Sequence, residues 1–281
     1  MYTDVMRERK TDKKKKRIMI LCAIILLLIL IIAITYKQIV YAVAPKSYYK
    51  MAVKATYKDL ECITSIVSEE KSKLDLNADI LDMTLDGKSY DRMIGGSVGA
   101  LIERDNAWNK TDIDAYIGVS FIRLATVKLY RDYHEMTFSE DIGGSEYKIK
   151  PEELDEKLKL PLNNLLSVYN RLDSMDVKLI DRKSRCYEFS CDGITYKVWI
   201  GKKHKITRIQ TDGIDIELSG KTNVFETIHV SVDSSDEKIK GSLDATLSID
   251  EDKKKTKIDS AYVSGEYGER SVTVSLKGRF R

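Results

Sequence analysis

ITYKVWIGKKHKITRIQTDG, residues 194–213, is the stretch of this sequence that decides the fold. Tyr196, Val198 and Ile200 alternate with other residues up to Gly201, and an apolar pattern resumes a few residues later. Such alternation is typical of a β-strand with one buried face, because successive side chains of a strand point to opposite faces. A glycine between two such runs indicates a turn. The stretch therefore predicts two antiparallel strands.

Runs of the same kind fill the rest of the C-terminal half. Short turn signals separate most of them, namely Asp192-Gly193, Gly201, Asp212-Gly213, Gly220 and Gly241. Connections this short favour antiparallel hairpins, since a parallel crossover needs about a dozen residues or more. The expected strands are residues 177–180, 187–190, 194–200, 206–211, 214–218, 224–232, 243–249, 258–263 and 272–280.

A second group of strands precedes them. The clearest runs from Ile113 to Phe121, where apolar residues alternate with polar ones; we expect the neighbouring Asp112 and Asp114 to face solvent. A turn is expected at Asp86-Gly87. The other strands expected in this half are residues 74–80, 98–102, 127–129 and 147–150.

Helices are expected at two places. Pro45 suits a first helical turn, and apolar residues at three- and four-residue spacing predict an amphipathic helix over about residues 47–70. We expect its tyrosine-rich stripe to pack on the sheet, although a stripe of this kind also suits a partner or lipid. Pro151 opens a short helix that Pro161 ends, and a second helix follows to about Ser174, so that a helix pair is inserted in the sheet over about residues 151–174.

An apolar segment near the N-terminus predicts a single transmembrane helix. Residues Ile18 to Ile34, centred near Leu26, contain no charge, amide or glycine. Extended to Tyr36, the segment is close to the roughly 20 residues that a helix needs to cross the hydrocarbon core. We therefore expect a transmembrane helix over residues 18–36, a juxtamembrane segment over 37–46 and one β-rich domain over 47–281.

The charges beside this segment predict its orientation. Residues 1–17 hold eight Lys or Arg against three Asp or Glu, while the whole chain carries +3. The positive-inside rule keeps such a tail in the cytoplasm, so the domain is expected outside the cell membrane. The run also suits anionic headgroups, and beside a membrane helix we do not expect nucleic-acid binding. The topology-setting residues are Lys13, Lys14, Lys15, Lys16 and Arg17.

A cleaved signal peptide is the alternative for this end, because Ala42-Val43-Ala44 has the form of a processing site. The apolar run is longer than the usual 7 to 15 residues of a signal core, at about 17. Pro45 would also follow the cut directly. We therefore expect a retained anchor, with cleavage after Ala44 left open.

The order of these elements resembles the lipoprotein-carrier half-barrel superfamily, including membrane-anchored relatives in Gram-positive bacteria. A leading amphipathic helix, a long antiparallel meander, helices inserted partway and the stretch 194–213 carry the resemblance. It implies a curved sheet around a hydrophobic cavity closed by helices, with an acyl chain or similar lipid as cargo. No specific ligand residue transfers, and a tether departs from the soluble carriers.

No enzyme constellation is complete in the sequence. Ser97 lies in a G-x-S-x-G pattern, but no buried parallel strand is expected before it and no helix after it, so we interpret the pattern as a glycine-rich hairpin connection. His134, His204 and His229 are isolated, and no metal-ligand spacing is present. We therefore expect no enzyme, no cofactor and no metal, with hydrolysis through Ser97 as the minor alternative.

The cysteines are expected to be free thiols. On one strand, Cys186 and Cys191 would lie about 16 Å apart, too far for a disulfide. Cys62 reaches either of them only if its helix packs on that strand.

Two function classes stay open. The first is a tethered extracytoplasmic module that binds a lipid or another hydrophobic envelope molecule; the second is a non-enzymatic scaffold or sensor that binds a protein partner. An open concave face favours the first and a filled interior the second. The candidate cavity-lining residues are Ile117, Phe189, Trp199 and Phe225.

Overall fold

The structure is a computed structural model. It describes residues 36–37, 40–63, 71–89, 96–105, 110–119, 122–132, 135–140, 144–150, 153, 161, 165, 168, 171–234, 239–250 and 255–280. They belong to two compact units, residues 1–48 and 49–281, and each is described by itself.

The first unit is helical where it is described. The Ala44 N–H donates to the Val40 carbonyl at 2.8 Å, and the Tyr48 N–H donates to the Ala44 carbonyl at 3.0 Å, so the helical path continues through Ala44. The expected transmembrane segment lies outside the described residues, apart from Tyr36. Among the residues that are described, no helix combines the length and the hydropathy that a membrane crossing needs.

Helix α2, Pro45–Ile63, leads into the second unit. It begins with the proline that the sequence placed in a first helical turn. The expected continuation to about residue 70 lies outside the described residues.

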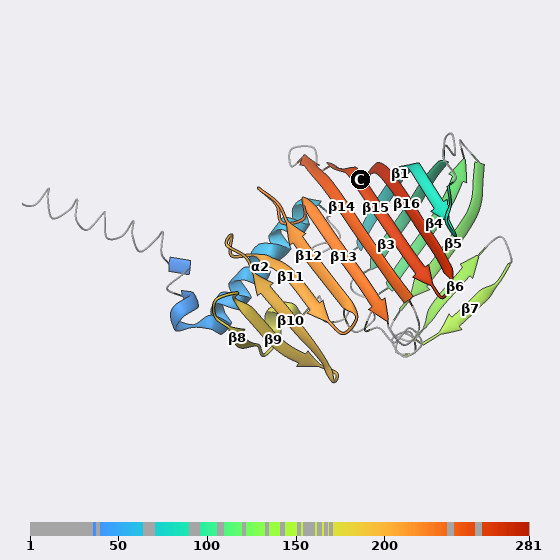
Figure 1. The fold of residues 1–281 in the computed structure, drawn as a ribbon. Coiled ribbons are helices and arrows are strands. Elements are labelled where there is room, and N and C mark those ends of the chain that lie inside the picture. Colours follow the sequence, from blue (N-terminus) through green and yellow to red (C-terminus); the bar gives the residue numbers. More distant parts are fainter. Residues whose placement is uncertain are drawn as a thin grey trace, which may run out of the picture. The chain divides into compact units, whose positions relative to one another are not determined.

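The second unit is one large antiparallel sheet of 16 strands (Figure 1). The first group consists of β1 (Lys71–Leu85), β2 (Lys88–Ser89), β3 (Gly96–Asp105), β4 (Lys110–Val119), β5 (Ile122–Arg131), β6 (Met136–Glu140) and β7 (Glu146–Ile149). The second consists of β8 (Lys178–Asp181), β9 (Cys186–Cys191), β10 (Ile194–Ile200), β11 (Ile206–Thr211), β12 (Ile214–Ser219), β13 (Thr227–Ser234), β14 (Ile239–Asp250), β15 (Lys255–Tyr267) and β16 (Arg270–Phe280).

The two groups are meanders joined at one seam. In the sheet, β1 lies between β3 and β16, so the last strand of the chain returns to pair with the first. The outer strands of the two meanders, β7 and β8, form the two edges. The antiparallel meander with a leading helix that the sequence predicts is thus confirmed.

The expected turns are confirmed where two residues of positive φ close a hairpin. Asp192 and Gly193 have φ of 52° and 80°, and Asp86 and Gly87 have 48° and 74°. A two-residue turn with both φ values positive matches the twist of the flanking strands, which explains the Asp-Gly sequences.

Two glycine predictions are wrong. Gly241 was expected in a turn but lies inside β14, directly opposite Gly265 of β15. Gly96 was expected in a hairpin connection but is the first residue of β3; Gly99, counted in that connection and also in the strand expected over 98–102, lies within β3. The second case has a packing cause, because a Cβ at Gly99 would lie 2.4 Å from the ring of Tyr116 on the neighbouring strand. Glycine marks a close approach there rather than a turn.

Several strand starts differ from expectation, and β6 was not expected; two of the differences have a clear cause. β1 begins at Lys71, three residues early, because its first lysines lie opposite the acids of β3: Lys73 reaches Glu103 at 2.9 Å. β13 begins at Thr227 rather than at residue 224, because residues 220–226 form a loop held by Glu226.

Helical residues occur within the expected insertion at Glu153, Leu165 and Val168, and a short 3-10 helix, η2, covers Leu172–Ser174. The remainder of residues 151–170 lies outside the described residues, apart from Pro161.

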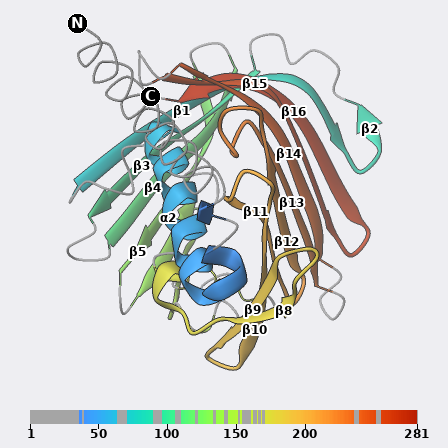
Figure 2. The same ribbon diagram turned by 90° about the vertical axis from the view of Figure 1, so that its left-hand side faces the viewer.

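The strand registers give the sheet one apolar and one polar face. On the apolar face, each strand presents its aliphatic residues opposite those of the next, as in the row Leu243, Val263 and Val274. The residues between them, such as Tyr262 opposite Asp244, form the polar face. The sheet bends around its apolar side, and helix α2 lies on that inner side (Figure 2).

Candidate hydrophobic site

The apolar face is buried under helix α2 and also at a cluster on β14 and β15, and it is partly exposed elsewhere; the cluster consists of Ala245, Leu247, Ile258 and Ala261. Beneath the helix, Tyr187 of β9 and Val198 of β10 are fully buried. On β14, β15 and β16, the row Leu243, Val263 and Val274 keeps some exposure. Val127 at the far side of the face, on β5, is 47% exposed. Apolar side chains gathered on one inner face and left partly exposed are a feature of hydrophobic binding sites.

An aromatic contact and a hydroxyl group hold helix α2 against the sheet. The rings of Tyr49 and Tyr187 lie 5.3 Å apart, within the range of a favourable aromatic pair. The buried Thr56 hydroxyl donates to the Ala52 carbonyl at 2.9 Å and accepts the Ile206 N–H at 2.8 Å. Thr56 thus satisfies the first backbone donor of β11 and fixes the helix across the strand ends.

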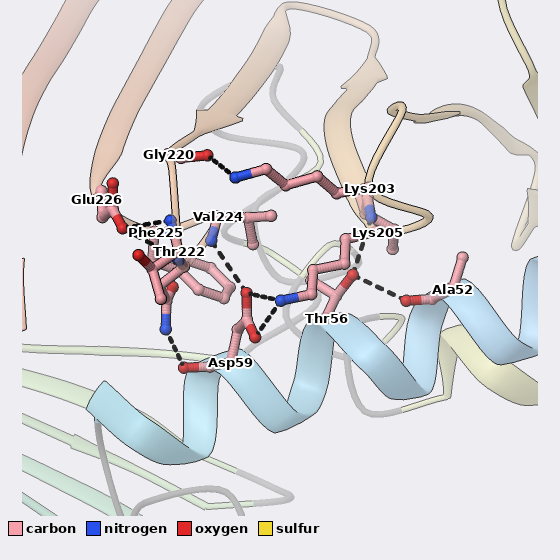
Figure 3. A network of polar contacts seen from close by, with 12 residues as sticks. Ala52, Thr56, Asp59, Lys203, Lys205, Gly220, Thr222, Val224, Phe225 and Glu226 are labelled. Carbon is pink, nitrogen blue, oxygen red and sulfur yellow. Dashed lines mark hydrogen bonds and ion pairs between the residues drawn. The ribbon is translucent and has the colours of Figure 1, made fainter. Parts of the chain in front are cut away.

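Asp59 makes a further attachment of helix α2 to the sheet (Figure 3). Its carboxylate accepts from Lys205 Nζ at 2.6 Å and from the Val224 N–H at 3.0 Å. The Asp59 carbonyl accepts from Asn223 Nδ2 at 2.9 Å. One helical residue therefore joins α2 to the β10–β11 turn and to the loop 220–226.

Glu226 holds that loop in shape. Its carboxylate accepts the backbone N–H groups of Lys221, Thr222 and Asn223 at 2.7, 2.8 and 2.9 Å. These hydrogen bonds, first that from Asn223, lower the pKa of Glu226 from its ordinary 4.5. The loop is therefore organised around an ionised carboxylate, and it presents Asn223 and Val224 to Asp59.

We predict that Glu226→Gln destabilises the domain by about 1–2 kcal/mol at neutral pH, because hydrogen bonds to a charged acceptor are lost. Since the folded pKa is lowered, the contribution is complete above about pH 5 and is lost as the pH falls through the folded value. Thermal unfolding of both proteins between about pH 3 and pH 7 should show a difference that shrinks toward acid. Glu266→Gln, an exposed change on β15, is the control.

The structure does not bring the four candidate lining residues together. Ile117 of β4 and Phe189 of β9 lie on the apolar face, in different meanders. Phe189 is buried and stacks on Tyr196, with ring centroids 5.1 Å apart. Trp199 lies on the polar face, where the Arg208 guanidinium sits 4.9 Å from its ring centroid. Phe225 lies in the loop 220–226 rather than on the sheet.

A shallow groove crosses the polar face of β3–β6. Its side chains include Glu103, Asp112, Asp114, Lys128 and Tyr130. Asp112 and Asp114, expected to face solvent, share the polar side of the sheet by register; Asp112 is exposed, but Asp114 is half-buried and its Oδ1 is buried. Leu101, Ile113 and Leu129 also line this groove, so charged and aliphatic residues border it together.

The residues considered for catalysis lie on separate elements. Ser97 is inside β3, paired with Asp79 and Gly118, so it is not on a strand-to-helix turn. His204 lies in the β10–β11 turn and His229 on β13, where its Nδ1 contacts Asp244. His134 is outside the described residues.

Both described cysteines, Cys186 and Cys191, are free and lie at opposite ends of β9. No turn separates them, as the sequence argument required. Burial is the main cause that raises the pKa of each thiol, which disfavours the reactive thiolate. The side chain of Cys62 lies outside the described residues.

Comparison with known proteins identifies no family: no family model matches the chain, and no curated protein matches it. What the structure shows is the architecture, a large antiparallel sheet with a leading helix.

Proposed function

We propose that the domain is a non-enzymatic binding module that holds a lipid or another elongated hydrophobic molecule on the apolar face of its sheet. The observation that carries this proposal is the division of that face. It is buried beneath α2 and at the β14–β15 cluster, but partly exposed at Leu243, Val263, Val274 and Val127.

The energetics suit an aliphatic ligand. Each methylene transferred from water to an apolar surface contributes about 0.8 kcal/mol, so a partly buried acyl chain binds without a charged anchor at its tail. Within the described residues the polar face carries more charge, since Glu103, Asp112 and Lys128 lie on it, although Leu101 and the exposed Tyr262 lie there too. The bend of the sheet also lets residues from several strands contact one chain.

We predict that a lipid co-purifies with the full chain from bacterial membranes. Val263→Asp should lower the bound amount about tenfold, because it places a charge among the aliphatic residues that contact the tail. Solvent extraction followed by mass spectrometry measures the effect.

Tyr262→Asp is the matched control, because Tyr262 is the neighbouring residue on β15 and faces the polar side. Val263→Phe keeps the site apolar and distinguishes a charge effect from unfolding. Equal lipid in the Val263→Asp and Tyr262→Asp proteins, or no lipid in any of them, would overturn the proposal and favour a scaffold that binds a protein partner.

We also propose that residues 18–36 tether this module to the cell membrane, with the domain outside. The basic excess of residues 1–17 supports this orientation. Protease added to intact protoplasts is expected to degrade the domain and spare the tail. Survival of the domain until the membrane is broken would contradict the orientation.

A further inference from the structure

Two glycines leave a depression in the apolar face. Gly241 of β14 and Gly265 of β15 are direct partners, flanked by Val232 of β13 and Val272 of β16. A Cβ at Gly241 would meet only the Ser264 carbonyl, at 3.5 Å, and one at Gly265 only Val272 Cγ1, at 3.5 Å. Both are ordinary contacts within the sheet, so a Cβ at either position would not clash with the chain.

Other strand glycines have a packing reason that this pair lacks. A Cβ at Gly278 of β16 would lie 2.3 Å from the Asn77 carbonyl, and one at Gly99 would strike Tyr116. Glycine inside a strand weakens it unless something approaches closely. At Gly241 and Gly265 no part of the described chain would clash with a Cβ, which leaves room for a molecule that is not part of the chain.

The next row of the sheet forms a polar rim beside this depression. Ser234, Ile239, Tyr267 and Arg270 lie opposite one another across β13, β14, β15 and β16. By register they continue the apolar face toward the strand ends. Ser234 is only 3% exposed, and among the residues that the structure describes its hydroxyl has no hydrogen-bond partner. A buried hydroxyl without a partner is costly and points to a group that completes it.

Arg270 adds a positive charge to this rim. It is exposed, and within the part of the chain that the structure describes it has no ion-pair partner. Its strand neighbour Ser271 falls on the polar side, as do Glu266 and Lys240, which lie opposite each other. Glu269 lies in the adjoining turn.

We propose that the ligand is an amphiphile with an anionic head group, bound with its head at the rim of Ser234, Tyr267 and Arg270 and its tail over Gly241 and Gly265. This inference rests on the proposed function and narrows its ligand class. The Ser234 and Tyr267 hydroxyls donate hydrogen bonds to the head and Arg270 supplies the opposite charge. The glycine pair gives an alkyl chain room between Val232 and Val272.

The test uses the full chain in bacterial membranes and two light-activated probes with the same diazirine-bearing tail. One is a fatty acid and the other the corresponding fatty alcohol. After illumination, mass spectrometry of peptides measures labelling of β14 and β15. We expect the acid to label about tenfold more than the alcohol, the effect of one charge-assisted contact. Arg270→Gln should reduce the acid to the level of the alcohol.

Two further variants complete the design. Gly265→Val should reduce labelling by both probes while leaving the thermal unfolding temperature unchanged or higher, since valine favours strands and meets no clash. Ser234→Ala should reduce labelling by the acid, and Thr256→Val is its matched control, because Thr256 is also buried, without a described partner for its hydroxyl, but lies at the other end of β15.

The outcomes distinguish failure of the anionic-head-group inference from failure of the proposed lipid-binding function. Labelling by neither probe overturns the proposed function itself. Equal labelling by both probes, unchanged in Arg270→Gln, overturns the anionic head group while hydrophobic binding stands. Undiminished labelling of a folded Gly265→Val protein overturns the position of the tail.

Discussion

Replacing Gly278 by valine is expected to destabilise the domain by about 3 kcal/mol, through overpacking that the backbone must absorb. A Cβ at this position would lie 2.3 Å from the Asn77 carbonyl, 2.5 Å from Ala78 Cα and 2.6 Å from Ala78 Cβ. Backbone atoms cannot rotate away as a flexible side chain can. The clash falls on the β1–β16 seam, which joins the two meanders.

Thermal unfolding followed by circular dichroism measures the effect, with a fall of about 6–12 °C expected for a domain of this size. Gly265→Val is the matched control, since the same substitution on the adjacent strand meets no atom closer than 3.5 Å. Equal losses in the two proteins would show that the cost comes from glycine replacement in general and not from the seam.

The sequence could not indicate this seam. Its strands were predicted from local alternation, and Asp-Gly turns predicted which neighbours in the chain form hairpins. The pairing of Ala78 with Gly278 joins residues 200 positions apart, and no local pattern records it. Gly241 illustrates the same limit, because a glycine in a turn and a glycine inside a strand look alike in sequence.

The sequence predicts which face of the sheet each strand residue lies on better than it predicts the candidate site. The alternation of Tyr196, Val198 and Ile200 already assigns Trp199 to the other face, where the structure has it stacked against Arg208. The two-residue period of the strand therefore argues against Trp199 as a residue that lines the apolar face. Ser234 and Arg270 carried no signal in the sequence, because each becomes notable only beside strands that come from elsewhere in the chain.

The attachment of helix α2 depends partly on local sequence and partly on residues far away in the chain. The helix could be predicted from its spacing, but the role of Asp59 could not, since Lys205 and Val224 are about 150 residues away in the chain. In the structure these groups meet where Lys205 is 20% and Asp59 13% exposed. Because little water reaches these two charges, each of them depends on the other for the stabilisation that water would give.

Asp59→Ala is therefore expected to destabilise the domain by about 3 kcal/mol, because it leaves the Lys205 ammonium and the Val224 N–H buried without their acceptor. Urea unfolding measures the loss. Glu103→Gln is the control: it breaks the Lys73–Glu103 pair, whose side chains are 62% and 52% exposed, and should cost less than about 0.5 kcal/mol.

A double variant tests whether the loss of stability in Asp59→Ala comes from the unpaired charge of Lys205. Asp59→Ala with Lys205→Met removes both ions, and a protein more stable than the Asp59→Ala variant is expected, since the unpaired ammonium is gone. Equal stability of the two variants would mean that Lys205 is solvated well enough alone. A single-variant cost no larger than that of Glu103→Gln would mean that α2 is held on the apolar face by Tyr49 and Thr56 rather than by Asp59.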